Sequence, residues 1–131
     1  MRYMLDTDTC IYIMKHRPVS VRERLRHVAI DEVGISGIVL TELMHGVIKS
    51  EHRPRNQAAL EDFLGYCKVE DWPRAAAPIY GALRTELERK GKPIGSNDLL
   101  IAAHALAIDA VLVSNNQREF ARIATIIYSK F

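Results

Sequence analysis

The sequence predicts an α/β fold in which a parallel sheet is covered by helices on both faces. Short, continuously apolar segments at residues 3–5, 33–36 and 110–114 are typical of strands that are buried on both sides of a parallel sheet. Between them lie helical patterns of about ten to fifteen residues, as in βαβ units. At 131 residues the chain is long enough to bury its own core, so we expect a single domain over residues 1–131.

The first half of the chain is divided by clear boundary residues. The apolar run at residues 3–5 ends abruptly in the sequence DTDT, which marks the end of a strand. Pro18 disfavours helix at the residue before it, so a first helix should end near residue 16. The expected elements are a strand at 3–5, helices at 9–16 and 20–28, a strand at 33–36 and a helix at 38–49.

The second half contains the most apolar helix. Pro54 and Pro73 suit the first turns of two helices, and Gly91 suits the end of the second of these. Ser96 should cap the next helix, whose body LLIAAHALAI is apolar nearly all round and should be buried. The expected elements are helices at 54–66, 73–90 and from 96, and strands at 67–70, 110–114 and 123–128.

The composition indicates a soluble protein and leaves its partner open. Lysine and arginine number 18 and the acids 16, so the net charge of +2 does not by itself indicate nucleic-acid binding. The longest apolar stretch, residues 99–113, is interrupted by His104 and Asp109 and is too short to span a bilayer. The 2 cysteines form no CxxC pair, as expected of buried, reduced thiols. We therefore expect a cytoplasmic protein with no membrane partner.

Four acidic residues are placed so that the sheet should bring them together. Asp6 ends the first strand, Glu42 lies in the helix after the second, and Glu119 follows the strand at 110–114. Asp98 joins them if its helix packs at the same edge. Because ligands bind at the carboxyl ends of the strands in open α/β sheets, these four carboxylates are the candidate catalytic residues.

A cluster of carboxylates implies a metal ion. At an effective dielectric constant near 20, two like charges about 5 Å apart repel by roughly 3 kcal/mol. Several acids in one pocket therefore stay ionised only around a cation. Oxygen ligands without a histidine or cysteine cluster favour Mg²⁺ or Mn²⁺ over zinc. Such an ion can activate water for attack on a phosphodiester, which is nuclease chemistry.

Neighbouring polar residues are candidates for supporting roles. Asp8 follows Asp6 closely, and Ser114, Asn115 and Asn116 come directly after the last buried strand. Ser114 and Asn115 can orient ligands or water, and they suit turns equally well.

Each acid also has a simpler interpretation. Asp6 or Thr7 can serve only as the cap of the following helix. Asp98 can serve only as a favourable charge in the first turn of its helix, and Glu119 can be an exposed loop residue.

Four motifs together resemble PIN-domain ribonucleases, and in particular the VapC toxins. They are MLDT at residues 4–7, a serine followed by Glu-Leu within residues 36–43, GKPIGSNDLLIAAHA at residues 91–105, and VSNNxREF at residues 113–120. Each motif alone is weak, but their combined order and spacing is specific. The resemblance covers nearly the whole chain.

The resemblance implies a fold, a reaction and a ligand set. The fold is a PIN-like three-layer α/β/α sandwich with a four- to five-stranded parallel sheet, and the reaction is metal-dependent RNA cleavage that leaves 5′-phosphate and 3′-hydroxyl ends. Asp6, Glu42 and Asp98 are implied as ligands of Mg²⁺ or Mn²⁺, with a fourth contribution from Glu119 or Asn116. Similar toxins often carry asparagine at position 8, where this chain has aspartate.

The resemblance also implies partners. The substrate would be a structured RNA such as initiator tRNA, cut in its anticodon loop. A VapB-type antitoxin would neutralise the enzyme, in a homodimer and a toxin–antitoxin hetero-oligomer. Four basic residues near the acids, Lys15, Arg17, Lys90 and Lys92, are expected to contact RNA phosphates. Clusters of this kind are otherwise ordinary solvated helix faces.

Two other functions compete with this interpretation. A strand followed by DTD resembles the opening motif of haloacid-dehalogenase-type phosphatases, with Asp6 as nucleophile and Asp8 as acid and base. That motif expects Thr or Val where this chain has Cys10, and the later lysine and acid motifs are missing. The second alternative is a non-catalytic protein-binding domain that has kept the fold.

Overall fold

The computed structural model describes residues 1–16, 30–123 and 128–129. The helix expected at 20–28, Arg17 and part of the last expected strand lie outside the described residues.

Five parallel strands form one sheet in the described part of the chain. They are β1 (Tyr3–Leu5), β2 (Val33–Ser36), β3 (Lys68–Glu70), β4 (Val111–Val113) and β5 (Tyr128–Ser129). Their order across the sheet is β3-β2-β1-β4-β5, with Met4 opposite Gly34 on one side and Leu112 on the other. The predicted α/β class and the predicted parallel sheet are therefore confirmed.

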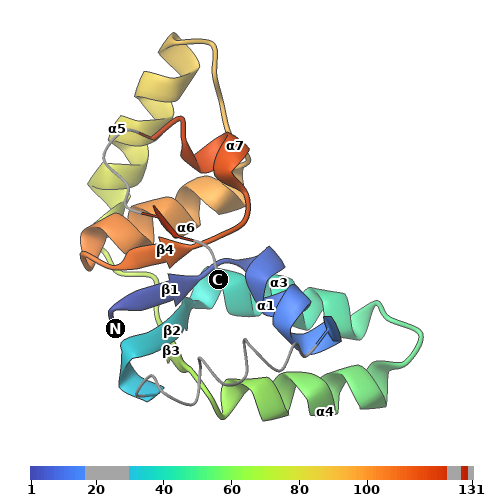
Figure 1. The fold of residues 1–131 in the computed structure, drawn as a ribbon. Helices are drawn as coiled ribbons and strands as arrows, with labels where there is room; N and C mark the ends of the chain where they lie inside the picture. Colours follow the sequence, from blue (N-terminus) through green and yellow to red (C-terminus); the bar gives the residue numbers. More distant parts are fainter. Residues whose placement is uncertain (17–29, 124–127, 130–131) are drawn as a thin grey trace.

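The helices form two groups (Figure 1). They are α1 (Thr7–His16), α3 (Gly37–Ile48), α4 (Arg53–Leu64), α5 (Ala76–Arg89), α6 (Ser96–Ala107) and the short α7 (Gln117–Phe120), with a 3₁₀ turn at Ile30–Glu32. In Figure 1, α1, α3 and α4 lie in the lower part of the molecule and α5, α6 and α7 in the upper part. Helices α1, α3 and α4 contact one another, and α5 packs along α6.

The strand order explains the two groups of helices. The chain moves across the sheet in one direction from β1 to β3 and in the opposite direction from β3 through β4 to β5. Parallel crossovers are almost always right-handed, so helices that connect strands in opposite directions cover opposite faces of the sheet. The three-layer α/β/α sandwich follows from this topology.

The core has the burial that the sequence predicts. Met4, Leu5, Ile35 and Leu112 have no exposed surface, as expected for strands that are covered on both faces. In α6, the five residues 101–105 are all buried. The half-buried Trp72 ties the chain before α5 to α6, because its Nε1 donates a hydrogen bond to the carbonyl of Leu100 at 2.9 Å.

Several element boundaries differ from the predictions. Helix α1 begins at Thr7 instead of residue 9, because Asp6 accepts a hydrogen bond from the Thr9 backbone. Gly95, not Ser96, is the N-cap of α6. The last strand is described at residues 128–129, and Ile123, expected at its start, is instead a buried core residue before it.

None of the helices in the described ranges has the length and apolar character that a bilayer crossing needs.

Candidate active site

The strand order creates a ligand-binding position between β1 and β4. The chain leaves the carboxyl end of β1 toward β2, whereas β4 lies on the other side of β1. Ligands in open α/β folds bind at such a switch point, outside the carboxyl ends of the strands. Asp6 follows β1 and Ser114 follows β4, so both lie at this position.

Asp6 is held rigidly at this edge. It is 2% exposed, its Oδ1 accepts a hydrogen bond from the Thr9 backbone at 2.9 Å, and its Oδ2 accepts one from the Ser114 hydroxyl at 2.5 Å. Thr9 also donates its hydroxyl to the Val113 carbonyl, which joins α1 to β4. Asp6 therefore caps α1 through Oδ1, as the simpler interpretation requires. Its other oxygen, Oδ2, faces Ser114 at the end of the neighbouring strand β4.

Glu42 reaches the same edge from α3. Ser36 ends β2 and caps α3 by accepting a hydrogen bond from the Ile38 backbone at 3.1 Å, which fixes the start of the helix. The Thr7 hydroxyl, in the first turn of α1, donates to Glu42 Oε1 at 2.6 Å. An acid on so apolar a helix needs a partner, and this hydroxyl provides one.

Asp98 and Glu119 meet at the N-terminus of α6. Asn116 links them, because its amide nitrogen lies 3.4 Å from Asp98 Oδ2 and 3.3 Å from Glu119 Oε2. The backbone of Gly95 donates a hydrogen bond to Glu119, and Asn116 is itself held by the Ser114 hydroxyl at 2.9 Å. Both carboxylates therefore lie at the positive end of the α6 dipole.

The pKa values show that the acids act on one another. Burial raises the pKa of Asp98 to about 8, and the hydrogen bond to Glu119 and the charges of Glu119, Asp6 and Glu42 add to the shift. The hydrogen bond to Asp98 lowers the pKa of Glu119, so the proton of this pair resides on Asp98. Asp8 is largely exposed, yet partial burial and the charges of Asp6 and Glu42 raise its pKa. Without a cation, these acids repel one another.

The donor set suits a hard divalent cation. The available ligand atoms are the carboxylate oxygens of Asp6, Glu42, Asp98 and Glu119, without a histidine or a cysteine among them. Such oxygen ligands favour Mg²⁺ or Mn²⁺. Among the described residues, no three acid, histidine or cysteine side chains are arranged as a group that could hold a metal ion. The acids are instead paired with the hydroxyls of Thr7 and Ser114 and the amide of Asn116.

The other predicted site residues lie farther from the acids. Asn115 is exposed beside Asn116, and Lys15 is exposed in the last turn of α1, roughly 12 Å along the helix from its first turn. Lys90 forms an ion pair with Glu86 at 3.2 Å at the end of α5, and Lys92 is exposed in the following loop. Of these basic residues, Lys90 and Lys92 lie nearest to Asp98 in the sequence.

Sequence reasoning missed three residues that shape the site. Thr7 was considered only as a possible helix cap and Thr9 was given no role, although the alternation of aspartate and threonine in DTDT was the available signal. Arg122 donates a hydrogen bond to the Pro93 carbonyl at 2.7 Å and so ties the loop before α6 to the segment after α7. No local pattern indicated this last contact.

Comparison with known proteins identifies the family. A family model described as the PIN domain matches residues 3–126. This chain belongs to the PIN-domain family. Among curated relatives, the ribonuclease VapC2 of Rickettsia felis is 47% identical over 128 residues, which cover 97% of this chain and 96% of the relative. The tRNA(fMet)-specific endonuclease VapC of Shigella flexneri is 42% identical, over 94% and 92% of the two chains.

Solved structures of VapBC complexes have the same fold. The VapBC2 complex of Rickettsia felis, bound to a DNA fragment from its promoter, matches this structure with a TM-score of 0.94 at 45% identity, covering 100% of this chain and 99% of that chain. DNA-bound VapBC from Salmonella typhimurium also matches with a TM-score of 0.94, at 42% identity. The predicted PIN-like fold and the predicted enzyme class, a VapC-type ribonuclease, are confirmed. Membership in this family is incompatible with the haloacid-dehalogenase alternative.

Proposed function

We propose that this chain is the toxin of a toxin–antitoxin pair and cleaves initiator tRNA in its anticodon loop with Mg²⁺ or Mn²⁺. The observation that carries the proposal is that the carboxylates after β1 and on α3, α6 and α7 lie near enough to one another for their charges to contribute to the raised pKa values of Asp8 and Asp98. The name of the Shigella flexneri relative, a tRNA(fMet)-specific endonuclease, supports the choice of substrate. Residues 1–131 would act as a single nuclease domain.

Each acid has a proposed role. Asp6, Glu42 and Asp98 would hold the cation, and Glu119 would complete the acidic set through Asn116. Ser114 would orient Asp6, and Asp8 would add charge at the rim. When bound, the metal supplies Lewis-acid chemistry, lowering the pKa of a water and stabilising phosphoryl charge. The chain's own contribution is to fix the acids through Thr7, Ser114 and Asn116 before the substrate arrives.

The proposed assembly follows from the solved relatives. Their crystals contain VapBC complexes, some bound to DNA. We accordingly expect a VapB-type antitoxin and a DNA-binding hetero-oligomer for this chain. The toxin homodimer is what the family resemblance implies. Because the proposed substrate is a tRNA, we expect the protein to act in the cytoplasm.

The proposal is tested by incubating the purified protein with initiator tRNA, elongator tRNAs and Mg²⁺, and mapping the cleaved ends by sequencing. The expected result is a single cut in the anticodon loop of the initiator tRNA that EDTA prevents. Cleavage of a different RNA would overturn the substrate. No cleavage of any RNA with either metal would favour the non-catalytic binding domain.

Thr7→Val should lower the cleavage rate about 10- to 100-fold, the usual effect of losing a group that orients a metal ligand. Valine keeps the size of threonine but removes the hydroxyl that donates to Glu42. Thr7→Ser is the matched control, because it keeps the hydroxyl. Initial rates and calorimetric titration with Mg²⁺ measure both effects. Equal rates and equal metal affinities for the two variants would contradict this role.

Asp8→Asn should weaken binding of Mg²⁺ and Mn²⁺ roughly two- to fivefold, the effect of one largely exposed charge. Asp8 feels the charges of Asp6 and Glu42, so it belongs to the same electrostatic cluster. The thermal stability with bound metal should change little. Titration calorimetry on the parent and the variant measures the difference, and identical affinities would count against the prediction.

Replacing Lys90 and Lys92 together with alanine should weaken binding to every RNA and reduce the slope of log K against log salt by roughly 1.5. Both side chains are exposed, and the two residues lie in the segment of the chain just before Asp98. Filter binding on Asp6→Asn protein over a salt series measures affinity without cleavage. The control pair, Lys49→Ala with Lys68→Ala, removes the same charge outside this loop. An unchanged slope for the Lys90 and Lys92 pair would refute phosphate contact.

A further inference from the structure

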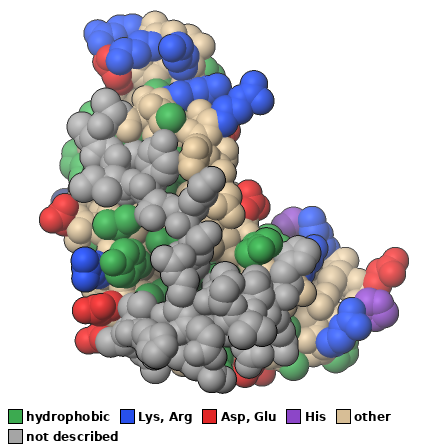
Figure 2. Space-filling view, in the orientation of Figure 1, with side chains coloured by type: hydrophobic (Ala, Val, Ile, Leu, Met, Phe, Trp, Pro, Cys, Tyr) green, Lys and Arg blue, Asp and Glu red, His purple; other side chains and the backbone are tan. Residues whose placement is uncertain are grey.

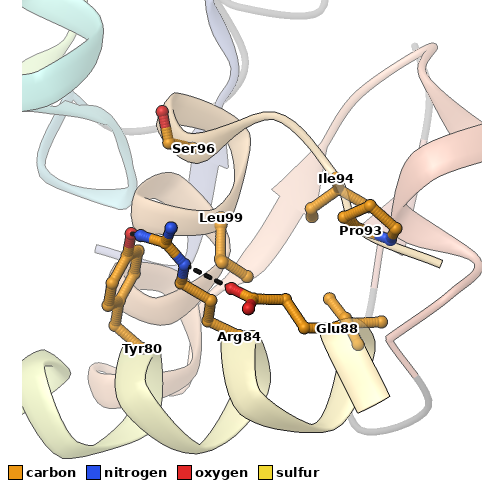
Figure 3. A pocket seen from close by; sticks show the side chains of 8 residues that line it. Tyr80, Arg84, Glu88, Pro93, Ile94, Ser96 and Leu99 are labelled. Carbon is orange, nitrogen blue, oxygen red and sulfur yellow. Dashed lines mark hydrogen bonds and ion pairs between the residues drawn. The ribbon is translucent and has the colours of Figure 1, made fainter. Parts of the chain in front are cut away.

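A pocket lies between α5 and the first turn of α6 (Figure 3). It has a volume of about 350 Å³ and takes in the end of the loop that joins the two helices. Its lining residues are Tyr80, Arg84, Leu87, Glu88, Pro93, Ile94, Ser96 and Leu99. This volume is at the small end of the range for ligand pockets, which suits one planar group better than a larger ligand.

The lining combines an apolar floor with a polar rim. Leu87 and Leu99 are buried and Ile94 is partly buried, so they provide an apolar surface. In Figure 3, Tyr80 and Arg84 lie at one side of the pocket, and Pro93 and Ile94 lie at the other. An aromatic ring and a guanidinium plane are the two protein groups on which nucleic-acid bases most readily stack.

Arg84 is oriented before any ligand arrives. Its Nε donates to Glu88 Oε1 at 2.6 Å and its Nη1 donates to the Tyr80 hydroxyl at 2.9 Å. Within the described residues, these contacts use Nε and Nη1, which point to different sides of the guanidinium, and leave Nη2 for a further acceptor. A base that presents an oxygen or ring nitrogen to the pocket would supply that acceptor.

The surroundings of the pocket favour a polyanion. Figure 2 shows Lys and Arg side chains gathered at the top of the molecule, over the end of α5 and the loop that follows. Arg84, Arg89 and Lys90 are all more than half exposed there. Charge complementarity therefore points to an RNA strand as the occupant rather than to an apolar protein segment.

The pocket lies next to the acid cluster. Ser96 and Leu99, one helical turn apart, line the pocket, while Asp98 on the same turn contacts Asn116 on another side of the helix. A helix with its side chains is about 10 Å across, so the pocket and the acids are separated by roughly that distance. A strand with its phosphate at the acids therefore has neighbouring nucleotides within reach of the pocket.

We infer that this pocket is a nucleobase subsite that takes one unstacked loop base near the scissile phosphate, with Tyr80 and Arg84 as its specificity-determining residues. The inference rests on the proposed function, because it assumes an RNA substrate. It assigns the recognition of base identity to the α5–α6 pocket, whereas Lys90 and Lys92 contribute phosphate contacts that carry no sequence information.

The test uses an RNA stem–loop with the anticodon-arm sequence of initiator tRNA, in which each loop base in turn is removed to leave an abasic nucleotide. Binding is measured in the Asp6→Asn background, so that the RNA stays intact. One abasic position should weaken binding to this parent roughly tenfold, as expected for loss of one stacked base. In Tyr80→Ala and Arg84→Ala protein, removal of that base should weaken RNA binding much less than in the parent, because the pocket no longer holds the base.

Arg89→Ala is the matched control. Arg89 is an exposed arginine on the same helix, and it pairs with Glu86 as Arg84 pairs with Glu88, but it does not line the pocket. Arg89→Ala should weaken binding to all the RNAs alike. Removal of the sensitive loop base should still weaken binding to this variant as much as it does in the parent, and at the same position. Arg84 is itself exposed, so Arg84→Ala tests the pocket without disturbing the core.

The subsite would be overturned if removal of the loop base weakened RNA binding equally in the pocket variants and in the parent. It would also be overturned if the parent were insensitive to the removal of every loop base. Sedimentation tests whether the occupant of the pocket is instead a second copy of the chain. If Tyr80→Ala and Arg84→Ala split a dimer, and removal of the base still weakens RNA binding as much as in the parent, the inference is wrong. Cleavage assays on the otherwise unaltered protein separate the two proposals. If the protein cleaves RNA normally but the pocket variants respond to base removal as the parent does, only the subsite is refuted. If the protein cleaves no RNA, the proposed function is refuted.

Discussion

Replacing Asp6 with asparagine should abolish RNA cleavage and leave the fold intact. The change removes one full ligand charge from the proposed cation site, and the several kcal/mol that a metal contributes to such a reaction correspond to a rate loss of about 10³-fold. Asparagine keeps an oxygen for the Thr9 backbone and places an amide toward the Ser114 hydroxyl, which can accept from it. Initial cleavage rates with Mg²⁺ and circular-dichroism melts measure the two effects.

The choice of asparagine matters for this experiment. Asp6→Ala would leave the buried Ser114 hydroxyl without its acceptor and remove the cap of α1, at a cost of about 1–3 kcal/mol, so lost activity could then reflect unfolding. Asp62→Asn, on the exposed face of α4, is the control for loss of one negative charge. Cleavage by Asp6→Asn at a rate close to that of Asp62→Asn would refute the ligand assignment.

Replacing Asp98 with asparagine should raise the melting temperature of the metal-free protein at pH 8 and change it little at pH 4. The pKa of Asp98 is raised in the folded state, from 3.8 to about 8. The folded protein therefore keeps a proton that the unfolded chain releases, so this group's contribution is fully present below pH 4 and is lost as the pH rises toward 8. The lowered pKa of Glu119 acts in the opposite direction and only partly offsets this loss.

Thermal melts in EDTA across pH 4–8 test this prediction, with Asp62→Asn again as the control. We expect a gain of several degrees at pH 8, since about 1 kcal/mol shifts the melting temperature of a domain of this size by roughly 3–5 °C. Mg²⁺ should reduce the difference, because a cation beside Asp98 favours the ionised carboxylate and so lowers the pKa that burial raises. A gain that is the same at pH 4 and pH 8 would show that the effect does not come from the ionised carboxylate.

The sequence alone was sufficient to predict the first four strands and the position of Asp6 at the end of the first of them. The segments 3–5 and 110–113 are apolar throughout, because a strand buried on both faces of a parallel sheet has no solvent-facing positions. Once these strands were placed, Asp6 and the residues after position 113 had to lie at one edge of the sheet. The predictions for the exact ends of elements were less accurate, because adjacent residues suit the cap position about equally well, as Asp6 and Thr7 do before α1 and Gly95 and Ser96 do before α6.

The tertiary structure alone decided how the acids are held and which of them retains a proton. The hydrogen bonds of Ser114 to Asp6 and of Thr7 to Glu42 join residues 108 and 35 positions apart, so no local pattern predicts them. The raised pKa of Asp98 depends on burial and on charges from other elements of the fold. The sequence could specify which chemical groups are present near the sheet edge, because strand positions follow from local periodicity. Their distances and protonation states depend on how helices distant in the sequence pack, and only the folded chain determines that packing.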